Sequence, residues 1–268
     1  MAVPYLRQAL RLIGPDACRL RAAIVDQLGN TLMDGGGEPR DAALRAAIDC
    51  HRQAAGIYQT LGMMDDWARL QFNLGNSCCE LSETTGEDHW QQAISHYEKS
   101  LQVRTREKHP ERYAAVLENL GTAYRRFPAQ DDSHIKKSIQ CYRRALAVYV
   151  RRTHPDQNAA LQNNLGNAFL SLPESDERVA TRNAARALRH FERALCLQSG
   201  STLGREFAIT QFNCAQAHFR LARYSSAIHL RLAAGCLEAA ATAFQVCGEA
   251  RYTQLVRAQL DRICCATA

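Results

Sequence analysis

A four-residue phrase recurs five times along this chain, at intervals of 45 to 49 residues. Its clearest copies read Asn73-Leu74-Gly75-Asn76 and Asn164-Leu165-Gly166-Asn167. A second phrase, typically Ala-Ile, follows each copy. Self-similarity at a period of tens of residues is the signature of a repeat protein, whose units stack on their neighbours. The first phrase occupies 27–30, 73–76, 119–122, 164–167 and 213–216, and the second begins at Ala47, Ala93, Ser138, Ala187 and Ala227.

The spacing between the two phrases predicts the architecture. From the second phrase to the next copy of the first is always 28 residues, as from Ala47 to Gly75. A constant interval indicates two helices packed through a short turn of fixed length. The interval within each repeat varies from 12 to 21 residues, which is typical of surface loops. These variable stretches are rich in Gly, Pro, Ser and Asp, the residues of turns, and they are 34–39, 82–88, 127–133 and 172–176.

The segments around the phrases have the apolar period of helices. Leu117, Leu120 and Tyr124 recur at three and four residues, whereas no segment alternates as a strand does. Pro110 and Pro155, each followed by an acid, predict first helical turns. Asp65-Asp66 is expected to cap the equivalent helix one repeat earlier. The predicted fold is therefore all-α.

The repeats resemble the tetratricopeptide repeat (TPR). That family has Leu-Gly and an aromatic residue in its first helix, helix A, and Ala, an aromatic and Ala in its second, helix B. Leu120-Gly121-Tyr124 matches helix A, and Ser138-Tyr142-Ala145 matches helix B. The Gly has a physical role, because only a very small residue lets the two helices approach closely. The resemblance covers about residues 17 to 240.

The repeats are longer than the ordinary 34-residue TPR, and in this they look like those of bacterial CHAT-protease-associated proteins and kinesin light chains. The resemblance implies one right-handed α-α superhelical solenoid over 1–268. A final helix from Glu249 to Cys265, polar at Gln254, Arg257, Gln259, Asp261 and Arg262, is expected to cap it. The expected repeats are 17–60, 65–108, 110–153, 155–199 and 204–240, followed by a cap at 241–268.

The resemblance also implies a binding surface on helix A. In TPR proteins the positions before and after Leu-Gly point into the inner groove. Nine of these ten positions are carboxamides here, which can both donate to and accept from a peptide backbone. The residues expected to line a peptide groove are Gln27, Asn30, Arg69, Asn73, Asn76, Asn119, Thr122, Arg125, Arg126, Asn164, Asn167, Asn213 and Gln216.

Two uses of these carboxamides remain open and are compatible. They can hold an extended partner segment, or they can bond between neighbouring helices and brace the superhelix. If the partner is acidic, Arg69, Arg125 and Arg126 are the expected charge partners.

The net charge of +6 is unevenly distributed, with 12 Lys or Arg against 5 Asp or Glu from Leu101 to Arg152. A surface for nucleic acid or an acidic partner is one interpretation. Charge runs are more often solvated helix faces, so nucleic acid is the less favoured partner.

Signals for an enzyme are weak. Cys50, His96, Cys141 and His190 form one helix B column, but stacked repeats are about 10 Å apart, too far for residues in one column to share a metal ion. Cys214 and His218 lie four apart but at positions expected in the core. The 11 cysteines include adjacent pairs at 78–79 and 264–265 and have no disulfide-framework spacing. Gly35-Gly36-Gly37 precedes no phosphate-loop Lys.

The sequence thus predicts a non-enzymatic binding scaffold without cofactor or metal, whose partner is a protein or peptide. The alternative is a structural or regulatory subunit that self-associates or joins a larger bacterial assembly. No apolar stretch is long enough for a membrane span, and the N-terminus lacks the pattern of a secretory signal. We therefore expect a cytoplasmic protein.

Overall fold

The computed structural model describes residues 2–14, 18–34, 39–129, 131–198, 204–224 and 228–267, with side chains as far as 263. Ala227, Gly35-Gly36-Gly37 and the side chains of Cys264 and Cys265 lie outside this description. All regular structure in the described residues is α-helical. The chain divides into two compact units, Met1–Pro128 and Ala129–Ala268.

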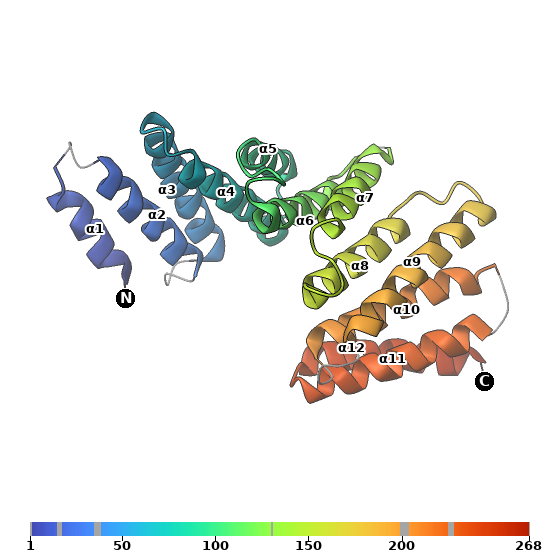
Figure 1. Cartoon of the computed structure of the whole chain (residues 1–268). Helices are drawn as coiled ribbons and strands as arrows, with labels where there is room; N and C mark the ends of the chain where they lie inside the picture. The colour runs from blue at the N-terminus through green and yellow to red at the C-terminus, as the bar shows by residue number, and fades with distance from the viewer. Residues whose placement is uncertain are drawn as a thin grey trace. The chain divides into compact units, whose positions relative to one another are not determined.

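In the first unit each helix packs on the next, and α4 also contacts α6. Figure 1 shows the helices running back and forth in succession, as stacked helix pairs do. The helices are α1 (Ala2–Leu12), α2 (Cys18–Met33), α3 (Arg40–Thr60), α4 (Met64–Thr85), α5 (Trp90–Leu101) and α6 (Pro110–Arg126).

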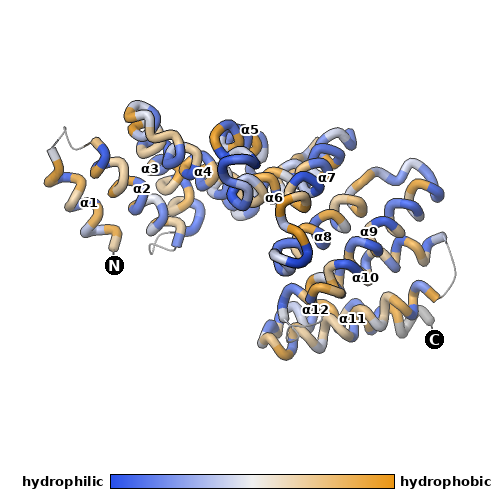
Figure 2. Tube along the Cα trace, in the orientation of Figure 1, coloured by the Kyte–Doolittle hydropathy of each residue, from blue (hydrophilic) through white to orange (hydrophobic). Residues whose placement is uncertain are grey.

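The second unit is built in the same way, and there α8 contacts α10 in addition to the neighbour α9. Hydrophobic and hydrophilic positions alternate along the helices of both units (Figure 2), as expected when one face of each helix is buried. The helices are α7 (Ser133–Leu146), α8 (Pro155–Leu170), α9 (Glu177–Gln198), α10 (Arg205–Ala222), α11 (Ile228–Val246) and α12 (Ala250–Thr267).

The predicted all-α solenoid of stacked helix pairs is confirmed in its class. The expected repeats 17–60, 65–108 and 155–199 correspond to the pairs α2–α3, α4–α5 and α8–α9, whereas α11 runs to Val246, six residues beyond the expected end of the repeat 204–240. The division into repeats stays a prediction. The helices of the expected repeat 110–153, α6 and α7, lie in different compact units, so its status as one pair stays a prediction, as does the single solenoid over 1–268. Helix α1, which packs on α2, precedes the first repeat and has no counterpart among the expected helices.

The glycine of the first phrase lies where a helix B ring packs against helix A. A Cβ atom on Gly75 would lie 2.5 Å from Cε1 of Tyr97, and one on Gly29 would lie 2.6 Å from the His51 ring. Gly166 faces the ring of Phe191 in the same way. Such distances are shorter than any real Cβ contact, so close helix packing requires glycine at these positions.

Helix ends agree with the sequence in part. Helices α6 and α8 begin at Pro110 and Pro155, as predicted. The prediction that Asp65-Asp66 caps α4 is wrong, because the N-cap is Met63 and both acids lie within the first turn, where they face the positive end of the helix dipole. The predicted loop at 82–88 is also shorter, since α4 continues to Thr85 and ends at Gly86 with φ 75°, a conformation that favours glycine.

Helix α12 packs on α11 through Val256, Leu260 and Ile263. Four of its five expected polar residues are exposed, and Gln259 is half-buried. Tyr252 and Leu255 on the same helix are 42% and 58% exposed, so its outer surface is polar only in part.

Candidate functional site

The expected polar columns lie on the first helix of each pair, on both sides of a buried Leu-Gly step. In α4, Leu74 is 1% exposed, whereas Asn73 and Asn76 are half-buried. Because residues three apart share a helix face, Asn73 and Asn76 lie on the same side of α4. The same pattern recurs on α6, α8 and α10. On α2 the corresponding Gln27 is exposed.

In the first unit, hydrogen bonds join the polar columns of α2 to α4 and of α4 to α6. The Nδ2 of Asn73 donates to Oδ1 of Asn30 at 3.4 Å, and the Nδ2 of Asn119 donates to Oδ1 of Asn76 at 2.9 Å. In both cases the residue that follows Gly in one repeat accepts a hydrogen bond from the residue that precedes Leu-Gly in the next repeat. These four residues therefore brace neighbouring helices, which is one of the two uses that the sequence left open.

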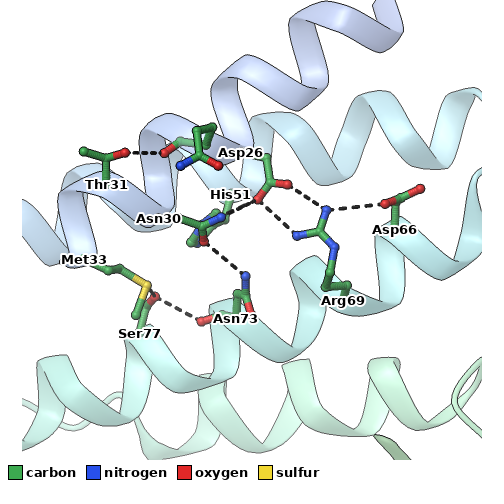
Figure 3. Close-up of polar contacts among 10 residues, drawn as sticks. Asp26, Asn30, Thr31, Met33, His51, Asp66, Arg69, Asn73 and Ser77 are labelled. Carbon is green, nitrogen blue, oxygen red and sulfur yellow. Dashed lines mark hydrogen bonds and ion pairs between the residues drawn. The ribbon is translucent and has the colours of Figure 1, made fainter. Parts of the chain in front are cut away.

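A charged cluster lies beside Asn30 and Asn73 (Figure 3). The two terminal nitrogens of Arg69 on α4 donate to the carboxylate of Asp26 on α2, at 3.3 and 2.7 Å. One of them also donates to Asp66 at 3.4 Å. Asp26 is 7% exposed, and a carboxylate so buried depends on a paired cation. The Arg69–Asp26 pair therefore joins α4 to α2.

His51 on α3 is fully buried next to this cluster, in the register where Tyr97 and Phe191 stand in other repeats. Burial lowers the pKa of His51, so the imidazole is neutral near pH 7. Its Nε2 lies 3.2 Å from Oδ1 of Asn30, which fixes the proton on Nε2 because that oxygen can only accept. Neither His51 nor Asp26 is among the site residues predicted from the sequence. The one feature of the sequence that could have indicated His51 is a histidine at a repeat position that is aromatic in Tyr97 and Phe191.

The three arginines expected to serve an acidic partner have different surroundings. Arg69 is neutralised by its two carboxylates. Arg126 is paired with Glu83 at 3.3 Å, and both side chains are nearly half exposed. Arg125 is half-buried, and its Nε has no hydrogen-bond partner among the described residues. Of the three, Arg125 alone carries a charge that no described carboxylate pairs with.

Two further residues of α6, Thr122 and Glu118, lie one turn apart beside Asn119. The hydroxyl of Thr122 donates to the Glu118 carbonyl oxygen within its own helix at 3.2 Å. Glu118 itself stands next to Asn119, and burial raises the pKa of its carboxyl to about 7. The carboxyl is therefore partly protonated near neutral pH, when it can donate as well as accept.

In the second unit a cleft of about 570 Å³ lies between α8 and α10. Asn163 and Asn164 line it, and the Nδ2 of Asn213 on α10 donates to Oδ1 of Asn163 at 2.9 Å. Asn167 and Gln216 are half-buried further along the same two helices and do not line the cleft. The other lining residues that bear on recognition are Asp156, Glu206, Phe207 and Thr210.

The helix B column of His and Cys has partners other than a metal ion. His96 Nδ1 lies 2.7 Å from Oε1 of Gln71, and His190 Nδ1 lies 2.7 Å from Oε1 of Gln162. No group of three or more His, Cys, Asp or Glu suited to a metal ion occurs within the part of the chain that the structure describes.

The Cys214–His218 pair is not joined in the structure. His218 Nδ1 lies 3.1 Å from Nδ1 of His229, while a hydrogen bond to Cys236 and burial raise the pKa of Cys214. Burial also raises the pKa of Cys78 and Cys79, to about 12 and 11. A thiol with a raised pKa is a poor nucleophile, so the geometry does not favour thiolate chemistry at these cysteines.

None of the described helices is both long and apolar enough to cross a bilayer.

Solved structures of repeat proteins are similar to this chain along most of its length. BtubC from P. vanneervenii matches with a TM-score of 0.64 and 17% identity, over 92% of this chain and 88% of that one. A kinesin light chain from Podosopora anserina with TPR-like repeats matches with a TM-score of 0.58 and 16% identity, over 84% and 95%.

A third match is the STAND signal-transduction ATPase with a tetratricopeptide repeat sensor from Pyrococcus horikoshii. Its TM-score is 0.53 at 15% identity, and 98% of this chain covers 40% of that protein. No family model and no curated protein sequence matches the chain. At these identities the matches establish the fold, which is of the TPR type.

Proposed function

We propose that this protein is a protein-interaction scaffold whose helix A face holds an extended segment of a partner. The main support is the α8–α10 cleft, because it joins a cavity of about 570 Å³ to two asparagines of the helix A face, Asn163 and Asn164. Such a cavity is large enough for one partner side chain. The asparagines beside it are suited to hold the adjoining backbone.

The first unit supports the same proposal through unused hydrogen-bonding groups on α4. Asn73 and Asn76 each give one group to a bracing bond. Among the residues that the structure describes, nothing bonds to Oδ1 of Asn73 or to Nδ2 of Asn76. Residues three apart on a helix are about 5–6 Å apart. One free acceptor and one free donor at this separation suit the N–H and C=O groups of an extended peptide.

The charge of the α8–α10 cleft favours a basic side chain of the partner. Asp156 and Glu206 both line the cleft, and neither is ion-paired with any described cation. Phe207 adds an aromatic face, against which the alkyl stem and charge of Lys or Arg can pack. We therefore expect a partner segment with a Lys or Arg that enters between α8 and α10.

The test is a selection from an unbiased library of linear peptides, with the full chain as bait. We expect enriched peptides to contain Lys or Arg, and their affinity to fall at least about tenfold in the Asn119→Ala, Asn164→Ala double variant. The Gln53→Ala, Gln59→Ala variant removes two exposed carboxamides of α3 instead and should bind as the original chain does. Unchanged binding by a folded Asn119→Ala, Asn164→Ala variant would refute the proposal.

Self-association is the second candidate. Large apolar side chains are exposed on the first helices, at Tyr5 and Leu12, and on the last ones, at Ile228 and Leu255. Exposed apolar side chains are surfaces through which copies of a protein can join. Light scattering across a range of concentrations tests this candidate, and a monomer at high concentration excludes it.

A further inference from the structure

Helix α9 carries five arginines on one face. Arg178, Arg182, Arg186, Arg189 and Arg193 follow each other at intervals of four, four, three and four residues, the spacing that keeps side chains on one side of a helix. All five are exposed. At 1.5 Å per residue the stripe is about 22 Å long.

The neighbouring helix α7 extends this basic surface. Lys136 and Arg143 of α7 line a cleft of about 560 Å³ together with Arg182 and Arg186 of α9. A second cleft of about 550 Å³ is lined by Arg151, Arg189 and Arg193, and by one acid, Glu192. Helices α7 and α9 together contain nine Lys or Arg and two Glu. We call the five arginines of α9, with Lys136 and Arg143, the arginine face.

Most of the arginine face is not neutralised within the protein. Lys136 pairs with Asp132 at 2.9 Å, and the guanidinium of Arg186 lies over the Phe169 ring at 5.8 Å. The other four arginines of α9 have no ion pair with any carboxylate that the structure describes. Like charges at i, i+4 repel and destabilise a helix, so a bound polyanion would relieve a cost that the free protein bears.

The surroundings of the arginines indicate which polyanion. No large apolar side chain is exposed on α7 or α9, although protein interfaces depend on aromatic or aliphatic anchors. Single-stranded nucleic acids are bound largely by stacking on aromatic side chains, and this surface exposes none. What remains is a row of guanidinium groups, which match phosphate oxygens in two-pronged geometry.

We propose that the arginine face binds the phosphate backbone of double-stranded nucleic acid, independently of its sequence. The site is separate from the α8–α10 cleft, with which it shares no residue. A 22 Å stripe spans roughly six base pairs at about 3.4 Å each. Four to five phosphate contacts give an expected slope of about −4 for the logarithm of affinity against the logarithm of salt concentration.

The test measures binding of the full chain to fluorescent 30-base-pair DNA and RNA duplexes of mixed sequence, by anisotropy at several salt concentrations. We expect salt-dependent binding to at least one duplex. In the Arg182→Gln, Arg189→Gln, Arg193→Gln variant, affinity should fall at least about tenfold and the slope should shrink by two to three units. The matched control, Arg19→Gln, Arg21→Gln, Arg251→Gln, removes three exposed arginines elsewhere and should change affinity less than about threefold.

Three results would overturn the proposal. The first is no binding to either duplex at low salt. The second is an equal loss of duplex affinity in the triple variant and in its control, which would mean that net charge alone determines binding. The third is binding to anionic lipid vesicles or polyglutamate without binding to duplexes, which would assign the surface to a membrane or an acidic protein. Circular dichroism of both variants establishes that they are folded.

Discussion

The imidazole of His96 on α5 is hydrogen-bonded to the side chain of Gln71 on α4, with 2.7 Å between Nδ1 and Oε1. His190 on α9 and Gln162 on α8 repeat this contact at the same distance. A His–Gln pair thus joins the two helices of alternate repeats, while Val25 and Cys50 hold the corresponding positions of the first repeat. The two histidines of the column Cys50, His96, Cys141 and His190, which in sequence resembles a set of metal ligands, therefore serve as hydrogen-bond partners between paired helices.

These pairs predict that the protein is destabilised by mild acid. Burial lowers the pKa of His96 and of His190 from 6.5 to about 4. Between these values the unfolded chain binds more protons than the folded one, so the free energy of unfolding falls as pH drops from 6.5 toward 4 and is fully retained above 6.5. Each histidine should contribute about 1–2 kcal/mol.

Urea unfolding at a series of pH values checks this prediction. The His96→Gln variant removes one titrating group and leaves a side chain that can still bond to Gln71. Its stability should depend on pH less steeply than that of the original chain. A variant profile parallel to the original one, shifted by a constant, would contradict the assignment to His96.

The repeat period made the helices predictable. Apolar spacing, prolines and loop composition all report local backbone preferences, and α6 and α8 begin at their predicted prolines. The need for Gly75 was predictable for a similar reason, because the glycine of the first phrase packs against an aromatic ring of helix B, which is Tyr97 here and Phe191 for Gly166. These features depend on residues within one repeat or between adjacent helices.

Features that depend on which helix faces meet could not be read from the sequence. Asn30 and Asn73 lie 43 residues apart and bond to each other, but the columns alone are equally suited to a ligand or a neighbour. The sequence indicated no ion-pair partner for Arg69, because Asp26 lies 43 residues away and meets it only through the packing of the helices. The basic surface of α9 was not predicted, because its five arginines are spread over residues 178 to 193 and form one surface only when the helix brings them to the same face.

A methyl group on Gly75 should be strongly destabilising. Its Cβ would lie 2.5 Å from Cε1 of the Tyr97 ring, and Tyr97 is 1% exposed, so the ring could shift only against other core side chains. We expect Gly75→Ala to lower the free energy of unfolding by about 2–3 kcal/mol. Gly56→Ala is the matched control, because it lies within α3 with nothing within 4 Å of the new atom. It should raise stability by about 0.5–1 kcal/mol through helix propensity. Equal effects at the two positions would be inconsistent with close packing at Gly75.

Loss of the Arg69 charge should also be costly. Asp26 is 7% exposed, so Arg69→Gln would leave a buried carboxylate without its cation. We expect a loss of about 1–3 kcal/mol, less than for a fully buried pair because Arg69 is 35% exposed. Arg52→Gln breaks the pair with Asp49, whose side chains are 62% and 66% exposed, and should cost under about 0.5 kcal/mol. Chemical denaturation of both variants decides the matter, and a near-zero effect of Arg69→Gln would show that the cluster does not join α2 to α4.

The buried carboxyl of Glu118 should give the opposite pH dependence from the histidines. Burial raises its pKa from 4.5 to about 7, so the folded chain binds more protons than the unfolded one between these values. Its contribution to the free energy of unfolding therefore declines as pH rises from 4.5 to 7 and stays low above. Glu118→Gln removes the buried charge, and at pH 8 it should raise stability by about 1–2 kcal/mol. At pH 4.5 the two proteins should agree within about 0.5 kcal/mol. A Gln variant that is less stable than the original chain at pH 8 would mean that the ionised carboxylate is favourable where it stands.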